Sequence, residues 1–259
     1  MSRWRGLGVA AVALLSFVAV KAVPWALGFA GGKYLYQTVA GSSGPKALTT
    51  ADVNAEIQKQ DFQIFKAIAQ EFPDDYDAMV SKITAVARSG NAQDVRNASR
   101  QAVADLRRRY ASLLPSAPDS NASEALSAQL DMLNHVMARE TPATCNNYLR
   151  NGPDAIGSPS HDFMVDLDRI GATLFHAFGA AKDSGLPAAA PVDQDWQLVA
   201  DAFTRNGGTP AEMDAIASAN QNFAGLCPAF AKLYTAALSL NGEPGRHIKT
   251  ALLYELARN

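Results

Sequence analysis

The sequence lacks the short motifs that mark common catalytic and cofactor-binding sites. It contains no HExxH zinc helix, GxSxG nucleophile elbow, Walker A loop or dinucleotide-binding glycine fingerprint. It also contains no CxxC pair that would support a zinc site. We therefore expect neither a metal nor a cofactor, and no motif names a reaction.

Long stretches in which apolar and polar residues alternate with a period of two are also missing, so no β-strand is predicted. Apolar residues instead recur every three or four positions between prolines, glycines and capping residues. The sequence predicts an all-α fold, with one N-terminal membrane helix followed by an irregular bundle of about nine helices. The helices have unequal lengths and no fixed repeat period, which favours a bundle over a solenoid.

The helices of the bundle are bounded by capping residues, glycines and prolines. A connection at residues 184–192 is the one expected internal boundary. We expect it to lie within a single domain. The expected helices span residues 49–72, 74–89, 92–114, 120–139, 161–182, 193–205, 210–223, 227–237 and 248–256, with a short helical turn at 145–148.

An excess of positive charge is missing outside the N-terminus. The first 45 residues hold four basic side chains and no acidic one. The rest of the chain contains 19 Lys and Arg and 25 Asp and Glu, which gives it a net charge of −6. Because neutralisation of phosphates supplies the sequence-independent part of nucleic-acid affinity, this charge argues against a nucleic-acid partner.

One long apolar run is present, at the N-terminus. We interpret residues 1–5 as a cytoplasmic stub and residues 6–32 as a transmembrane signal-anchor. The stretch 6–29 is long enough to cross a bilayer core if Lys21 extends its ammonium to the headgroups. The basic stub keeps the N-terminus in the cytoplasm, which places the rest of the chain across the inner membrane.

A cleaved signal peptide is the alternative interpretation, with cleavage after Ala30 or Ala40. Both interpretations export the remainder, which we divide into a linker at 33–48 and an α-helical domain at 49–259. Arginine outnumbers lysine and alanine is abundant, as in bacteria with GC-rich genomes. The predicted location is the bacterial inner membrane, with a single span and the C-terminal domain in the periplasm.

Only two cysteines are present, Cys145 and Cys227. In an oxidising compartment an even number of cysteines favours a disulfide. Closing the loop between them would stabilise the fold by about 4 kcal/mol in the chain-entropy model. Two small buried apolar residues are the alternative, and a catalytic cysteine is disfavoured because no histidine lies at a diagnostic spacing.

The densest cluster of titratable residues begins at His161. Asp162 and Asp166 are four positions apart and share one face of a helix. The three residues are candidates for acid–base catalysis or for holding a hard cation, although a solvated helix start explains them better. His135 and Glu140 are five positions apart, a spacing that does not place both on one helix face.

Arg100, Arg107 and Arg108 give the helix predicted at 92–114 a basic side and are candidate contacts for a partner. Cations in the C-terminal half of a helix also suit its dipole. The alternative is therefore a solvated surface with no partner.

Strong export signals without a catalytic motif favour a protein-interaction or assembly component of the cell envelope over an enzyme. An envelope hydrolase or lyase with a His/Asp site is one alternative, and a binder of an apolar ligand between helices is another. A deep cleft at His161 and Asp162 would favour the enzyme. A closed polar surface with one apolar patch would favour partner binding.

Overall fold

The computed structural model describes residues 48–89 and 91–258, and this part of the chain forms helices without any β-strand. The all-α prediction is confirmed, with more helices than the about nine expected. The described residues form eleven α-helices and two short 3-10 helices. In chain order these are α4 (Thr50–Lys59), α5 (Gln63–Glu71), α6 (Pro73–Ser89), α7 (Ala92–Tyr110), η1 (Ala111–Ser116), α8 (Asp119–Arg139), α9 (Pro142–Asn151), η2 (Gly152–Ala155), α10 (His161–Asp183), α11 (Asp193–Arg205), α12 (Pro210–Ala217), α13 (Leu226–Ser239) and α14 (Gly242–Arg258).

One extra α-helix arises where an expected helix is broken, and the other is α9, where only a short helical turn was expected. The helix expected at 49–72 is divided into α4 and α5 because Asp61 adopts a left-handed backbone conformation, with φ of 58°. The helix expected at 210–223 ends early, at Ala217, and Ala219 also has a positive φ, of 47°. Both breaks are at non-glycine residues, where the sequence gives no strong local signal.

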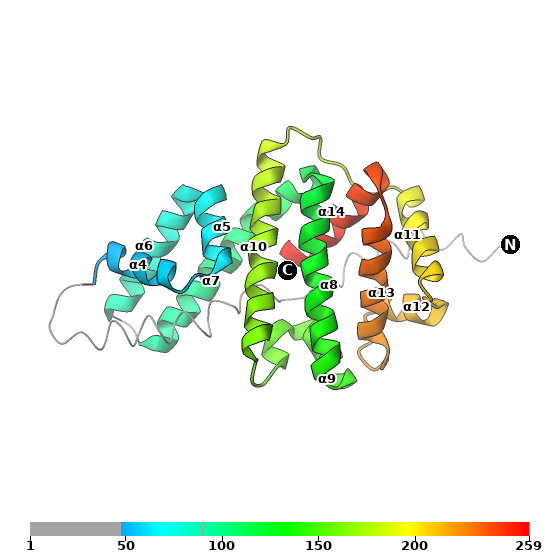
Figure 1. Ribbon diagram of the computed structural model, residues 1–259, viewed down its shortest axis with the longest axis horizontal. Coiled ribbons are helices and arrows are strands. Elements are labelled where there is room, and N and C mark those ends of the chain that lie inside the picture. Colours follow the sequence, from blue (N-terminus) through cyan, green and yellow to red (C-terminus); the bar gives the residue numbers. More distant parts are fainter. Residues whose placement is uncertain (1–47, 90, 259) are drawn as a thin grey trace.

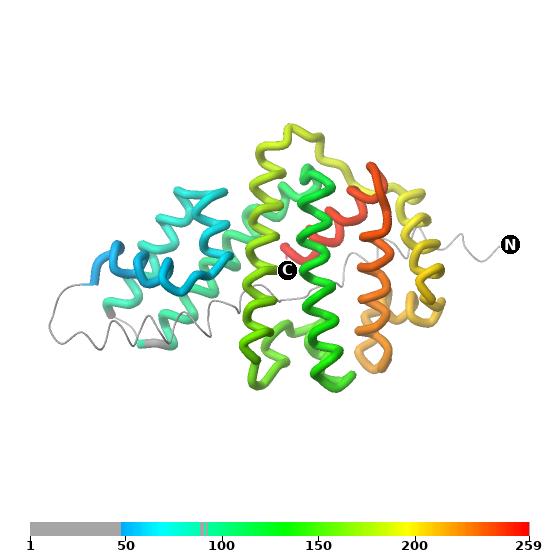
Figure 2. The backbone as a smooth tube through the Cα atoms, in the orientation of Figure 1, coloured from blue at the N-terminus to red at the C-terminus, as the bar shows by residue number. Residues whose placement is uncertain are grey.

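The helices form an elongated row with α8 and α10 as an antiparallel pair near its middle (Figure 1). Helices α4 to α7 form one end of the row, and α11 to α13 form the other. The C-terminal helix α14 crosses behind α8 in this view and packs on α8 and η1. The chain trace shows that α10 leads from the bottom of the central pair to the connection at its top (Figure 2).

Aromatic side chains join α5, α7 and α10 in the apolar core. Phe72 stacks on Tyr110, with 3.9 Å between the ring centroids. Phe175 meets Phe72 edge-on at 6.3 Å and Phe178 at 5.4 Å. Such pairs stabilise by about 0.5–1.5 kcal/mol beyond the burial of their area. These ring contacts hold α5 and α7 against α10.

The predicted disulfide between Cys145 and Cys227 is present. It joins α9 to α13, with a Cα–Cα distance of 6.1 Å, and both residues are buried. The bond links segments on either side of the connection at 184–192.

A buried carboxylate on α10 caps the N-terminus of α5. Phe62, at the N-cap position, supplies no side-chain hydrogen bond. The backbone N–H groups of Gln63 and Ile64 donate instead to Asp168, at 2.8 and 3.0 Å. Burial raises the pKa of Asp168, and the two backbone donors offset part of that rise.

Replacing Asp168→Ala is expected to lower the free energy of unfolding by about 2 kcal/mol, because it leaves helix-start N–H groups without an acceptor. Urea denaturation measures this loss. Asp168→Asn keeps one acceptor oxygen and is expected to cost less than Asp168→Ala. Equal stability of Asp168→Ala and the unmodified protein would show that water replaces this cap.

The predicted stub at 1–5 and membrane helix at 6–32 lie outside the described residues. Within 48–89 and 91–258, none of the helices has both the length and the apolar composition needed to cross a bilayer. The inner-membrane location therefore stays a prediction from the sequence.

Candidate functional site

Helices α8 and α10 are joined along their contact by three pairs of polar or oppositely charged side chains. On α8 the paired residues are four positions apart, so they lie on one face. On α10 the partners follow in reverse order because the helices are antiparallel. The pairs are Asp131–Arg169 at 2.7 Å, His135–Asp166 at 2.7 Å and Arg139–Asp162 at 3.9 Å.

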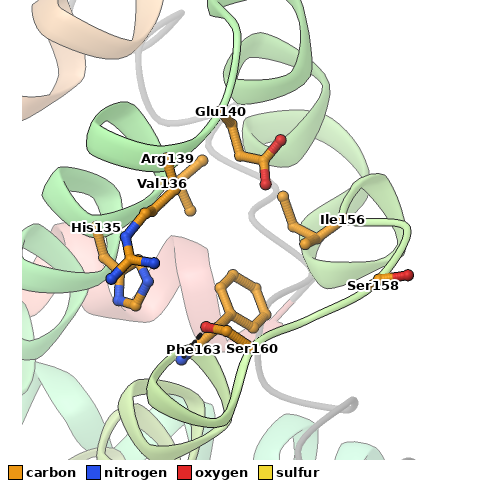
Figure 3. A pocket seen from close by; sticks show the side chains of 8 residues that line it. All are labelled: His135, Val136, Arg139, Glu140, Ile156, Ser158, Ser160 and Phe163. Carbon is orange, nitrogen blue, oxygen red and sulfur yellow. Dashed lines mark hydrogen bonds between the residues drawn. The ribbon is translucent and has the colours of Figure 1, made fainter.

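A pocket of about 220 Å³ lies beside the last two of these pairs. It opens between the end of α8, the connection from η2 to α10, and the first turn of α10 (Figure 3). This volume is below the ~300–1,000 Å³ of sites for drug-sized ligands. The pocket suits a small molecule or one side chain. Its lining residues are His135, Val136, Arg139, Glu140, Ile156, Ser158, Ser160 and Phe163.

His135 has a fixed orientation in this pocket. Its Nδ1 lies 2.7 Å from a carboxylate oxygen of Asp166, and its ring meets Phe163 edge-on. When the ring is neutral and Asp166 is ionised, Nδ1–H donates to the carboxylate and Nε2 is the acceptor. Nε2 forms no hydrogen bond with any described residue.

Glu140 enters the same pocket from the end of α8. It is the C-cap residue, and its extended backbone, with φ of −114° and ψ of 162°, turns away from the helix. Its carboxylate is directed toward the space above Phe163 (Figure 3). The spacing of His135 and Glu140 does not place them on one helix face, yet both line the pocket, because Glu140 lies beyond the regular helix.

Two buried tyrosines, Tyr148 and Tyr234, lie close to each other, and Tyr148 contacts Phe163. The ring of Tyr148 packs edge-on against Phe163, and the hydroxyls of Tyr148 and Tyr234 have no hydrogen-bond partner among the described residues. Burial raises the pKa of both phenols, and the proximity of Tyr234 and Asp166 adds to the rise at Tyr148. Both hydroxyls therefore stay neutral and add no charge beside the pocket.

The structure brings together only part of the predicted catalytic cluster. Asp166 bonds His135 and Asp162 lies near Arg139, but exposed His161 does not line the pocket. No group of histidine, cysteine and acidic side chains in the described residues is arranged to hold a metal ion. His135 could activate a water as a general base, but no side-chain hydroxyl or thiol of those residues bonds its Nε2.

Arg107 differs from the other candidate partner-binding arginines. It is only 1% exposed and donates to the backbone carbonyl of Leu256 on α14 at 2.9 Å. Burial lowers the pKa of Arg107 to about 10, so the guanidinium is still charged at neutral pH. The prediction that Arg107 contacts a partner is corrected, because its charge is used inside the fold. Exposed Arg108 pairs with Asp105, and half-buried Arg100 donates to Asn97.

Exposed large apolar side chains concentrate at the other end of α10. Of the four in the described part of the chain, three lie within residues 186–198, which we call the apolar segment. These are Leu186, Val192 and Leu198, and the fourth is Val165. Figure 1 places this segment in the connection above α10 and in the first half of α11.

Comparison of the chain with protein-family models, with curated proteins and with solved structures finds no match.

Proposed function

We propose that the chain is a membrane-tethered component of the bacterial cell envelope whose helical domain binds another protein in the periplasm. The apolar segment is the contact surface. The observation that carries this proposal is the concentration of exposed apolar side chains within residues 186–198. Exposed apolar groups gathered in one region are typical of interaction sites.

The composition and anchoring of the segment suit a binding surface. Residues 186–192 contain no charged side chain, so burial of this part of the segment requires no desolvation of a charge, whereas Asp193 is exposed at the start of α11. Two prolines restrict the backbone, and Ala189 N–H donates to the carbonyl of Pro115 at 3.2 Å. A segment already held in one conformation loses less entropy on binding.

The proposed location has two supports. The N-terminal basic stub and apolar run are typical of a signal-anchor or signal peptide. The disulfide between Cys145 and Cys227 suits an oxidising compartment such as the periplasm. Together they favour a domain on the outer side of the inner membrane.

Photo-crosslinking in intact cells tests the proposal. A photoreactive amino acid at position 192 is expected to give a discrete covalent adduct with one envelope protein. The same residue at position 165 is the matched control, because Val165 and Val192 are similarly exposed, at 52% and 59%. Position 165 lies near the opposite end of α10 and is expected to give no such adduct.

Two outcomes would contradict the proposal. Identical crosslinking patterns at 192 and 165 would show that the apolar segment has no preferred partner. A reporter fused after Asn259 that is active only in the cytoplasm would exclude the periplasmic location.

Adding Leu198→Asp is expected to abolish the adduct at 192, since it places a charge in the contact surface.

A further inference from the structure

The pocket between α8 and α10 presents hydrogen-bond acceptors that the fold does not use. His135 bonds Asp166 through Nδ1, which leaves Nε2 as an acceptor in the neutral ring. The carboxylate of Glu140 forms no hydrogen bond or ion pair with the described residues. An occupant that satisfies both groups must donate hydrogen bonds.

The charges around the pocket favour a cation. Three carboxylates lie in or beside it, on Glu140, Asp162 and Asp166, against one guanidinium on Arg139. Arg139 lies 3.9 Å from Asp162, which offsets part of its charge. With neutral His135, the local balance is negative, so a cationic ligand is attracted and an anion is repelled.

The rest of the pocket is apolar. Val136, Ile156 and Phe163 form its walls (Figure 3), and its volume of about 220 Å³ limits the length of any occupant. A short hydrocarbon stem can pack on these side chains. An aromatic ring such as that of Phe163 also attracts a cation at its face.

We propose that this pocket binds a primary ammonium group carried on a short apolar stem. A primary ammonium has three N–H donors, and the Glu140 carboxylate is an acceptor of opposite charge for them. The stem contacts Ile156 and Phe163. This chemistry is supplied by the lysine side chain or the N-terminus of a peptide, or by a free alkylamine. The site is separate from the apolar segment and does not depend on it.

Calorimetric titration of the full chain in detergent with n-butylamine, protonated at neutral pH, tests the inference. n-Butanol is the matched ligand, because it has the same stem without the charge. Butylammonium is expected to bind saturably and about tenfold more tightly than butanol, as charge-assisted hydrogen bonds are about twice as strong as neutral ones. Glu140→Gln is expected to weaken butylammonium binding about tenfold and leave butanol binding unchanged.

Glu124→Gln is the matched control variant, because it removes the same charge from an exposed position on the same helix. It is expected to bind butylammonium like the unmodified protein. Equal affinity for butylammonium and butanol, or equal weakening by both substitutions, would overturn the inference. Urea midpoints of both variants establish that they are folded.

Two further ligands distinguish the natural sources. Nα-acetyl-lysine amide presents a side-chain ammonium, whereas leucine amide presents an α-ammonium beside an apolar side chain. Glu140-dependent binding of the first supports the pocket as a site for lysine, and such binding of the second supports a peptide N-terminus. If butylammonium binds in a Glu140-dependent way and neither of these does, the free amine is the supported class.

Discussion

Replacing Asp119→Ala is expected to lower the free energy of unfolding by about 3 kcal/mol, because it leaves a buried lysine without its counter-ion. Lys249 on α14 is only 2% exposed, and its ammonium lies 2.6 Å from a carboxylate oxygen of Asp119 at the start of α8. Ser123 and the carbonyl of Leu240 accept its other hydrogen bonds at 3.0 and 3.1 Å. These two acceptors are neutral and do not replace a negative charge.

The expected cost lies at the lower end of the ~3–5 kcal/mol found for broken buried pairs, because Asp119 is partly exposed to water. Urea denaturation at neutral pH measures it. The double variant Asp119→Ala/Lys249→Met is expected to recover most of the loss. An apolar side chain in place of a buried charge removes the desolvation penalty.

Asp131→Ala on the same helix is the matched control. It removes the more exposed Asp131–Arg169 pair and is expected to cost less than about 1 kcal/mol. If Asp119→Ala costs no more than Asp131→Ala, water reaches Lys249 and the pair is not buried in solution. If the double variant is no more stable than Asp119→Ala, the loss comes from the α8 terminus rather than from Lys249.

Local signals in the sequence were sufficient for most helix boundaries. Thr209 followed by Pro210 predicts the start of α12, and Thr209 caps the helix there. The break at Asp61 had no such signal. The acceptor that caps α5 is Asp168, which lies 105 positions from Gln63 and reaches it only after α10 has packed on α5. A single-sequence argument from periodicity does not include such a contact.

The candidate site was only partly predictable for the same reason. Asp162 and Asp166 share a helix face, as their spacing predicts, but their partners lie on a different helix. His135 was recognised as a histidine near Glu140, yet the pocket forms only because Glu140 leaves the helix at its C-cap. The backbone conformation of one residue thus decides whether the two side chains line the same pocket.

The sequence around Arg107 indicates that this residue is buried, although its side chain is charged. Val103 and Tyr110 lie four positions before and three after it, so all three residues fall on the apolar stripe of α7. Val103 is buried, and Arg107 lies beside it with its guanidinium bonded to the end of α14. Position in the stripe was the better guide than residue type, because a buried cation is tolerated where an acceptor is available.

Removing the disulfide with Cys145→Ala and Cys227→Ala together is expected to lower the free energy of unfolding by about 4 kcal/mol. The two cysteines are 82 positions apart, so the bond closes a long loop and restricts the unfolded chain. Both residues are buried, and alanine adds no polar group at either position. Urea denaturation with and without reductant measures the loss.

Reductant is expected to shift the urea midpoint of the unmodified protein and leave that of the double variant in place. Asn146, beside Cys145, donates to the carbonyls of Gln221 and Phe223 at 3.0 and 2.9 Å. These bonds hold the segment before α13 without the disulfide, so the reduced protein is expected to stay folded but weakened. Equal midpoints of the oxidised and reduced forms would contradict the stabilising role. Two free thiols trapped by alkylation in intact cells would argue against an oxidising compartment and hence against the periplasmic location.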